Sequence, residues 1–354
     1  MRIGLVDPLA YTPPYDHSLA AALAERGHAV TLLTSRFPHG DAPPRAGYDR
    51  EELFAPVSTR VFRRSPARFA LKALEYAPSV ARLTRRIRRL DPDILHVQWL
   101  PRPELDLRWL RTVAAERPVV LTAHDVLPRR RQARAVWPEV LEKAERVVVH
   151  SRRAVEQLTE LGLGRERIAR IPHPVFEHEE LPPPEGRTLL FFGLIRDYKG
   201  LDVLLRALPE IPDTRLVVAG DPLDPVEPVD LDGRVEWRLR FLPDDEVREL
   251  MVRAAAVVLP YRQLDSSGVL ATAIGYRRPV VVSDVGSLGE IVREFAAGEV
   301  VPPGDPHALA QATTRLLEPE ALAAAHQGAA RAASALTWAN AAEEHDRLYR
   351  EVRR

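Results

Sequence analysis

Residues 188–202 read TLLFFGLIRDYKGLD, and this stretch decides the kind of fold that we expect for the chain. It begins with a short apolar run typical of a buried strand, and the run ends in Gly193, which lets the backbone turn tightly. Arg196 and Lys199 follow, three residues apart, just before a predicted helix. A strand, a glycine turn and a helix in this order predict one unit of a parallel α/β sheet.

The same alternation extends from this stretch toward both ends of the chain. Upstream of it, we expect strands at Arg2–Val6, Ala29–Thr34, Ile94–Gln98, Val119–Thr122 and Val147–His150. From residue 188 onward, we expect strands at Thr188–Phe192, Arg215–Ala219, Val235–Leu239, Ala256–Leu259, Pro279–Ser283 and Glu299–Val301. Amphipathic segments between the first set predict helices at Ser18–Arg26, Ser79–Leu90, Glu104–Ala115, Gln132–Lys143 and Arg152–Gly162.

A stretch rich in Pro and Glu separates the two sets of elements and marks a linker. We therefore expect an α/β protein of two Rossmann-like, doubly wound domains that face each other across a cleft. The boundaries that we predict are 1–175 for the first domain, 176–186 for the linker, and 187–336 for the second domain. Residues 337–354 should form a helix that packs back on the first domain.

The composition excludes several classes of protein. The 354 residues contain no Cys, which excludes disulfide scaffolds, cysteine nucleophiles and thiolate metal sites. No apolar run approaches the length of a membrane span, and the first residues do not resemble a signal peptide, so we expect a cytoplasmic protein. The net charge is zero, but residues 1–175 hold 30 basic and 20 acidic side chains, whereas residues 176–354 hold 20 and 30. This asymmetry reflects either chance or different partners for the two halves.

The common nucleotide and metal motifs are missing from the sequence. It contains no G-x-x-x-x-G-K-[ST] loop, and no G-x-G-x-x-G follows the first strand. Its histidines and carboxylates show no metal-ligand spacing. We therefore expect neither a P-loop enzyme nor a dinucleotide dehydrogenase, and no metal or other cofactor.

Three segments of the second domain carry the functional argument. Arg196 and Lys199 beside a helix start suit a diphosphate, although they can also be read as solvated surface cations. Only three of the 50 basic residues are lysines, which favours a specific need for an ammonium at Lys199. Ser266-Ser267-Gly268 at the start of a later helix offers hydroxyls and backbone N–H groups to an anion, or is an ordinary helix cap. Residues 279–292 form a further strand and glycine-bearing loop, with Glu290 in the next helix.

Taken in order along the chain, these and other short motifs resemble those of family 4 glycosyltransferases of the GT-B architecture. The motifs that carry the resemblance are residues 26–32 (RGHAVTL), 93–96 (DILH), 121–125 (LTAHD), 149–151 (VHS), 171–174 (IPHP), the Arg196/Lys199 loop and the Gly286/Glu290 loop. The resemblance covers essentially the whole chain. It is specific for the family and not for the substrate.

The resemblance implies a nucleoside-diphosphate sugar as co-substrate, bound mainly by the second domain. Arg196 and Lys199 would hold its diphosphate in place of a metal, with net retention at the transferred sugar. The other donor-binding residues that we expect are Gly193, Ser266, Ser267, Gly268, Val269, Leu270, Thr272 and Glu290. His124 would act near the reacting centre, although a strand-end histidine can also be purely structural. Tyr15, Asp16 and Arg129 are the candidates for contact with the acceptor.

The chain departs from the family pattern at two places. Family members commonly carry two glutamates separated by seven residues, and here Asp265 and Thr272 fall at those positions, with an ambiguity of one residue. Asp265 can still accept hydrogen bonds from sugar hydroxyls, so we predict it as a catalytic-site residue beside His124. The Gly-Gly of the first loop is replaced by Pro13-Pro14. This replacement puts contacts borrowed from that loop in doubt.

A basic stretch at residues 60–90 holds ten cations against Glu75 alone. Its second half predicts a helix with one apolar face and five arginines opposite, which suits either an anionic membrane surface or an ordinary surface position. We therefore expect an acceptor that is anionic or lipid-linked, peripheral membrane contact through 60–90, and no nucleic-acid partner.

The sequence as a whole predicts a metal-independent, retaining glycosyltransferase that uses a nucleoside-diphosphate sugar. Two alternatives remain open at this point. One is a catalytically silent subunit that binds or activates a partner enzyme, which the missing acid pair favours. The other is a sugar-nucleotide epimerase on the same scaffold, which would need more carboxylates in the cleft.

Overall fold

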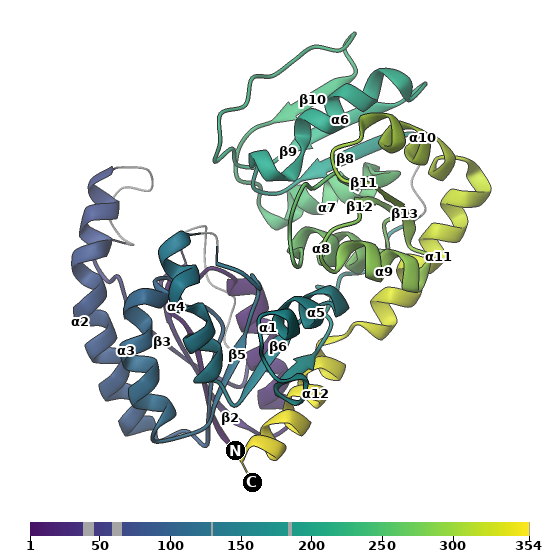
Figure 1. Cartoon of the computed structure of the whole chain (residues 1–354). Coiled ribbons are helices and arrows are strands. Elements are labelled where there is room, and N and C mark those ends of the chain that lie inside the picture. Colours follow the sequence, from purple (N-terminus) through teal and green to yellow (C-terminus); the bar gives the residue numbers. More distant parts are fainter. Residues whose placement is uncertain (38–45, 59–65, 129, 183–185, 354) are drawn as a thin grey trace. The chain divides into compact units, whose positions relative to one another are not determined.

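The computed structural model describes residues 1–37, 46–58, 66–128, 130–182 and 186–353 (Figure 1). The chain forms two compact units, and each is described by itself. The first unit contains Met1–His150, Ala154–Ile171 and Trp338–Arg354. The second unit contains Ser151–Arg153 and Pro172–Thr337.

The first unit is built on a seven-stranded parallel sheet of order β3-β2-β1-β4-β5-β6-β7. Its strands are β1 Arg2–Asp7, β2 Ala29–Ser35, β3 Asp49–Phe54, β4 Ile94–Val97, β5 Val119–Thr122, β6 Arg146–Val149 and β7 Ile168–Arg170. The five strands predicted for this half are confirmed within one or two residues at their ends. The two that the sequence does not reveal, β3 and β7, are the edge strands, which lack the continuous apolar run of a strand buried on both faces.

Two helical layers cover this sheet, as Figure 1 shows. One layer contains α2 (Pro66–Leu90), α3 (Pro103–Ala114) and α4 (Arg131–Glu142), and the other contains α1 (Pro13–Glu25) and α12 (Trp338–Val352). The remaining helix is α5 (Arg152–Glu160), followed by a short 3₁₀ turn, η1 (Arg165–Arg167). Because α12 packs against α1, the predicted return of the C-terminal helix to the first domain is confirmed.

Two helices of the first unit begin earlier than the sequence predicts. Helix α1 begins at Pro13, so the candidate acceptor residues Tyr15 and Asp16 lie in its first turn and not in a loop. Proline is accepted there because the first N–H groups of a helix need no intrahelical partner. Helix α2 continues through Pro78, which a sequence-based boundary treats as a helix breaker.

The second unit repeats this plan with a six-stranded parallel sheet of order β10-β9-β8-β11-β12-β13. All six predicted strands are present: β8 Thr188–Phe192, β9 Arg215–Ala219, β10 Val235–Arg238, β11 Ala256–Leu259, β12 Val280–Ser283 and β13 Gly298–Val301. The helices are α6 (Leu201–Ala207), α7 (Asp244–Arg253), α8 (Gly268–Gly275), α9 (Leu288–Phe295), α10 (Pro306–Leu316) and α11 (Pro319–Ala335), with 3₁₀ turns η2 (Asp197–Lys199) and η3 (Leu208–Glu210).

The strand order places one topological switch point in each sheet. In the first sheet it lies between β1 and β4, and in the second it lies between β8 and β11. Loops that leave the carboxyl ends of such strand pairs in opposite directions form the ligand crevice of doubly wound sheets. The loops after β1, β4, β8 and β11 are therefore where the candidate site residues are expected to gather.

Within the described ranges, no helix combines the length and the apolar character that crossing a membrane requires.

Candidate functional site

The loop after β8 brings a glycine, a lysine and a valine into close contact. Gly193 has φ +104°, a left-handed value that only glycine adopts without strain. A Cβ added to Gly193 would lie 3.0 Å from Lys199 Nζ and 2.8 Å from Val269 Cγ2. The absence of a side chain at Gly193 therefore lets the ammonium of Lys199 lie against the backbone, beside the start of α8.

Lys199 is a buried cation whose charged neighbour is another cation. Only 6% of the residue is exposed, and its Nζ lies 5.4 Å from the ring centroid of Tyr261. Burial, followed by the positive charge of Arg196, lowers the pKa of Lys199 to about 7. A buried ammonium is costly unless an anion compensates it. This arrangement is therefore suited to a bound anion that supplies the missing negative charge.

The loop after β11 leads to the amino terminus of α8 in the same region. Ser267 is the N-cap of α8, and its Oγ accepts a hydrogen bond of 3.2 Å from the backbone N–H of Leu270. Gly268 is exposed, which leaves the first turn of the helix open to solvent. The Thr272 hydroxyl donates to the Gly268 carbonyl at 2.9 Å, so its proton is used within the helix.

The loop after β12 packs directly against the Asp265 backbone. The N–H of Ser287 donates to the Asp265 carbonyl at 2.8 Å, and a Cβ on Gly286 would lie 2.4 Å from the same oxygen. This contact joins two segments that the sequence separates by twenty residues. The Glu290 carboxylate accepts hydrogen bonds from the backbone N–H groups of Arg152 and Arg153 at 2.9 and 3.0 Å. Its predicted part in donor binding remains a prediction.

In the first unit, polar side chains follow one another across the carboxyl ends of β4, β5 and β6. The Gln98 amide lies 3.2 Å from His96 Nε2 and 3.0 Å from His124 Nε2, and His150 Nε2 lies 3.4 Å from His124 Nδ1. The Trp99 ring stacks on His124 with centroids 4.9 Å apart and an interplanar angle of 12°. The His124 ring is therefore held from several sides.

The hydrogen-bond partners of His96, His124 and His150 indicate which ring nitrogen of each histidine carries a proton. Burial lowers the pKa of His150 to about 4, so His150 is neutral at pH 7, and its Nδ1 donates to the Ile171 carbonyl at 2.8 Å. His96 Nε2 accepts from the Thr122 hydroxyl and the Gln98 amide nitrogen. The Gln98 carbonyl oxygen then accepts from His124 Nε2, which fixes a proton on that nitrogen.

The loop after β1 is organised by a buried carboxylate. Asp7 accepts hydrogen bonds from the backbone N–H groups of Leu9, Tyr11 and Thr12 at 3.3, 2.6 and 3.1 Å. Burial and then the adjacent Asp7 raise the pKa of Asp16 well above its usual value, and burial also raises the pKa of Asp7. Carboxyl groups that share a buried site in this way cannot both ionise.

The structure brings together most of the donor residues predicted from the sequence, namely Gly193, Lys199, Ser267, Gly268, Val269 and Leu270, at one switch point. Tyr15 is buried and packs edge-on against His124 with centroids 4.9 Å apart, while Asp16 is buried beside Asp7. Their acceptor contacts remain predictions, and Arg129 lies outside the described residues. Among the described residues, no cluster of His and carboxylate side chains is arranged to hold a metal ion.

The sequence does not reveal the roles of Gln98, Trp99, Asp7 and Tyr261. A usable signal existed for the first three, because each lies at or directly after the carboxyl end of a predicted strand. Tyr261 also follows a strand, but its burial beneath Lys199 depends on the packing of α8.

Two family models match successive parts of the chain. The model described as Glycosyltransferase Family 4 matches residues 15–177, and the model described as Glycosyl transferases group 1 matches residues 186–319. The chain belongs to the family 4 glycosyltransferases. It is accordingly a nucleotide-sugar-dependent glycosyltransferase, and the family expected from its motifs is confirmed.

Two of the curated relatives of this glycosyltransferase have names that state a lipid acceptor. It is 29% identical over 352 residues to the phosphatidyl-myo-inositol mannosyltransferase of Mycolicibacterium smegmatis, covering 92% of this chain and 87% of that protein. It is 35% identical over 120 residues to the GDP-mannose:glycolipid 4-beta-D-mannosyltransferase of Xanthomonas campestris, covering 32% of this chain and 34% of that protein.

A solved structure confirms the GT-B fold of this glycosyltransferase. The sucrose-phosphate synthase of Thermosynechococcus elongatus matches with a TM-score of 0.75 at 20% identity. The match covers 99% of each chain.

The pKa of Lys199 predicts how nucleoside diphosphate binding responds to pH. A diphosphate held by Lys199, as we predict, would stabilise the ammonium, so above pH 7 its binding would be accompanied by proton uptake at Lys199. We expect the Kd for a nucleoside diphosphate to rise with pH above 7, by up to about tenfold per unit. Calorimetry between pH 7 and 9 in buffers of different ionisation enthalpy measures both quantities. A Kd independent of pH in this range, without proton uptake, would contradict the assignment.

Proposed function

We propose that this glycosyltransferase moves mannose from a nucleoside-diphosphate mannose to a phosphate-bearing, lipid-linked acceptor at a membrane surface. The observation that carries the donor assignment is the buried Lys199, whose pKa of about 7 reflects a cation without a compensating charge at the switch point of the second sheet. The mannose and the lipid acceptor rest on the printed names of the relatives.

The leaving group of the proposed reaction is a nucleoside diphosphate, and its departure concentrates negative charge on the β-phosphate. Lys199 and Arg196 would neutralise that charge, assisted by the exposed first turn of α8 at Gly268. Because the two cations supply the positive charge that a metal provides in other enzymes, we propose that transfer is metal-independent. Activity should then persist in the presence of EDTA.

His124 is proposed to act beside the transferred sugar. Its ring is fixed by the Gln98 amide and stacked on Trp99, so its orientation is set before any substrate binds. Asp265 remains the proposed acceptor of sugar hydroxyl hydrogen bonds, and Thr272 makes a weaker contact to the ribose. Net retention of the anomeric configuration follows from the family resemblance, and proton NMR of the first product formed tests it.

The basic face of α2 supports contact with an anionic surface. Two of its arginines are engaged in ion pairs, because Arg86 contacts Glu51 at 2.5 Å and Arg88 contacts Glu116 at 3.2 Å. Arg85 and Arg89 are exposed and lie on the same helix. These two are therefore the described cations of α2 best placed to meet lipid phosphates. The predicted contact also includes residues 60–65, which lie outside the described residues.

Replacing Arg85 and Arg89 with glutamate tests this surface. We expect the double variant to lose at least about tenfold in affinity for phosphatidylcholine vesicles that contain phosphatidylinositol, since each cation near such a surface contributes about 1 kcal/mol. Sedimentation with vesicles measures the loss, and the wild-type binding should weaken with added salt. Arg108→Glu and Arg111→Glu on α3 form the matched control, since they change the charge of the same unit equally. Equal losses in both pairs would rule out a specific role for α2.

A panel of nucleoside-diphosphate sugars tests the proposed function directly. The purified protein is incubated with each donor, with and without EDTA, in the presence of vesicles that contain phosphatidylinositol. We expect transfer of mannose from its nucleoside-diphosphate donor to the lipid. Mass spectrometry of the extracted product detects this transfer. Slow hydrolysis of a different nucleotide sugar would instead reassign the donor.

The same panel separates the alternatives. Donor binding by calorimetry without hydrolysis or transfer would favour a silent subunit, and the Asp265 and Thr272 departures motivate that outcome. Conversion of the donor to its epimer would favour an epimerase.

A further inference from the structure

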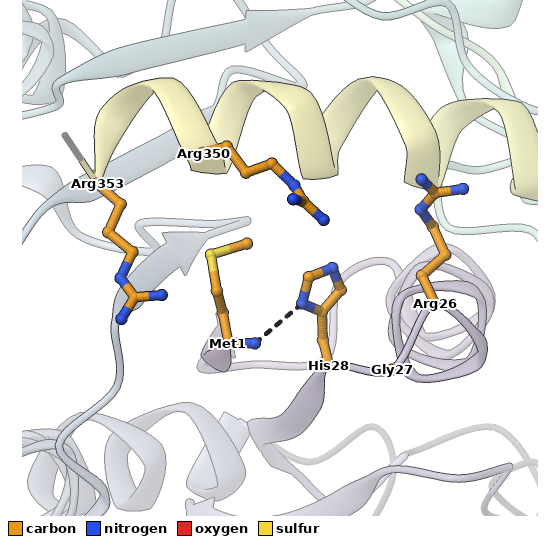
Figure 2. Close-up of a pocket in the computed structure, with 6 residues that line it drawn as sticks. All are labelled: Met1, Arg26, Gly27, His28, Arg350 and Arg353. Carbon is orange, nitrogen blue, oxygen red and sulfur yellow. Dashed lines mark hydrogen bonds between the residues drawn. The ribbon is translucent and has the colours of Figure 1, made fainter.

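A cavity of about 500 Å³ opens at the amino ends of β1 and β2, within the first unit. Figure 2 shows the six residues that line it: Met1, Arg26, Gly27, His28, Arg350 and Arg353. Arg26 and Gly27 follow the end of α1, His28 precedes β2, and the two remaining arginines come from the end of α12. More than 320 positions separate His28 from Arg350 in the sequence, so no local motif predicts the cavity.

Every titratable side chain that lines this cavity is basic. Figure 2 shows the guanidinium group of Arg350 directed at the His28 imidazole, with Arg26 and Arg353 on either side. The Nδ1 atom of His28 lies 3.3 Å from the Met1 nitrogen. The side chains of the three arginines are 36%, 67% and 56% exposed. They are therefore accessible to a ligand from solvent.

One buried carboxylate behind the lining, Asp346, contacts three of these groups. Asp346 is contacted by Arg26 at 3.3 Å, by His28 at 3.1 Å and by Arg350 at 3.0 Å. Burial lowers the pKa of His28, so the permanent cations at Asp346 are Arg26 and Arg350, and one carboxylate balances the charge of only one of them. Further partners lie at greater distances, since Arg353 reaches Asp93 at 3.4 Å and Arg26 reaches Glu343 at 4.0 Å. Both distances exceed the roughly 2.8 Å of a well-formed charge-assisted hydrogen bond.

The guanidinium groups retain hydrogen-bonding capacity for a ligand. Each carries five N–H donors in a planar fork that matches phosphate oxygens. The Nε and Nη2 atoms of Arg350 donate hydrogen bonds to the Asp346 carboxylate, and Nη1 is not part of this pair. The carboxyl ends of α1 and α12 carry partial negative charge that favours cations at these positions. The cluster is therefore stable without a ligand and complementary to one.

We propose that this cavity is a second anion site, which binds a ligand carrying two or more phosphate groups. The cavity lies at the amino end of β1, whereas the proposed catalytic region of the same unit lies at the carboxyl ends of the strands. Strand β1 has six residues, Arg2–Asp7, so the two ends are about 20 Å apart. Its volume is large enough for a polyphosphate or a phosphorylated headgroup. The site recognises phosphate, which either a soluble metabolite or a phosphorylated lipid can present.

Tripolyphosphate is the probe for this site. The experiment uses the full chain with Arg196→Ala and Lys199→Met, so that the proposed donor site contributes little to binding. We expect one equivalent of tripolyphosphate to bind by calorimetry. Adding Arg353→Gln should weaken that binding by about tenfold, and adding Arg350→Gln with it by about a hundredfold, because each guanidinium contact to phosphate contributes on the order of 1.5 kcal/mol.

Arg347→Gln is the matched control. Arg347 lies on the same helix and is 59% exposed, but it pairs with Glu343 and Glu344 and does not line the cavity. Arg353→Gln leaves the Arg350–Asp346 pair intact, so it remains informative if Arg350→Gln lowers the stability of the fold. An unchanged Kd in Arg353→Gln, an equal loss in Arg347→Gln, or no binding in the parent variant would each overturn the proposal.

Vesicles identify the source of the phosphate. Phosphatidylcholine vesicles with a phosphatidylinositol phosphate are compared with pure phosphatidylcholine. If the phosphoinositide vesicles capture the protein and Arg353→Gln abolishes that capture, the site exists and its ligand is a lipid. Binding of tripolyphosphate without capture supports the site with a soluble ligand.

Discussion

Replacing Lys199 with methionine is expected to abolish most transfer while making the unliganded protein more stable. We expect kcat/KM to fall by about a thousandfold or more, because Lys199 would stabilise charge that develops on the leaving diphosphate inside a site shielded from water. The stability gain follows from the same burial. A methionine fills the space of the lysine stem without placing a charge beside Arg196.

The expected pH dependence of this gain can be worked out from the pKa of Lys199. Burial lowers it from 10.5 to about 7, so between these values the unfolded chain holds a proton that the folded chain has lost. The free energy of unfolding of the wild type therefore rises with pH across this window. The cost of the buried ammonium is complete below pH 7 and has vanished above about 10.5. The advantage of Lys199→Met should be largest at or below pH 7.

Thermal unfolding from pH 6 to 9, with and without a nucleoside diphosphate, measures this effect. The ligand should raise the melting temperature of the wild type by more than that of Lys199→Met. Lys143→Met serves as the control, since Lys143 lies at the end of α4 in the other unit. Wild-type activity in Lys199→Met would remove the diphosphate assignment, and a loss of stability would show that the buried charge is compensated in the free protein.

Replacing His124 with alanine is expected to lower kcat by about a hundredfold to a thousandfold. The donor Kd should change much less, because the proposed diphosphate ligands Arg196 and Lys199 are untouched. Single-turnover kinetics with a saturating donor separates the two effects. The substitution also opens space beside Trp99 and Tyr15, so a lower melting temperature is expected in addition.

Gln98→Leu tests whether the orientation of the His124 ring contributes to catalysis, because the variant keeps the histidine and removes its hydrogen-bond partner. The variant keeps His124 but removes the amide that accepts from its Nε2, so we expect a kcat loss of about tenfold. His326→Ala in α11 is a control for loss of a partly buried histidine. Full activity in His124→Ala would leave the histidine with a structural role only.

The sequence by itself determined the doubly wound character of both units and the strands buried on both faces. Those strands are continuous apolar runs because helices cover both sides of each sheet, and that pattern is local. The position of Arg196 and Lys199 after β8 was also readable, since a glycine turn between a strand and a helix is a local feature. The edge strands β3 and β7 were not predicted from the sequence. An edge strand has a neighbouring strand on one side only, and the sequences of β3 and β7 are correspondingly less apolar.

Only the tertiary structure decided the chemistry of individual groups. The pKa of Lys199 depends on its burial against Tyr261 and on Arg196, and the tautomer of His124 depends on the Gln98 amide, which follows β4. The cluster of Arg26, Arg350 and Arg353 exists because α12 returns to pack against α1. Burial and electrostatic neighbours arise from residues that are distant along the chain, so no local pattern specifies them.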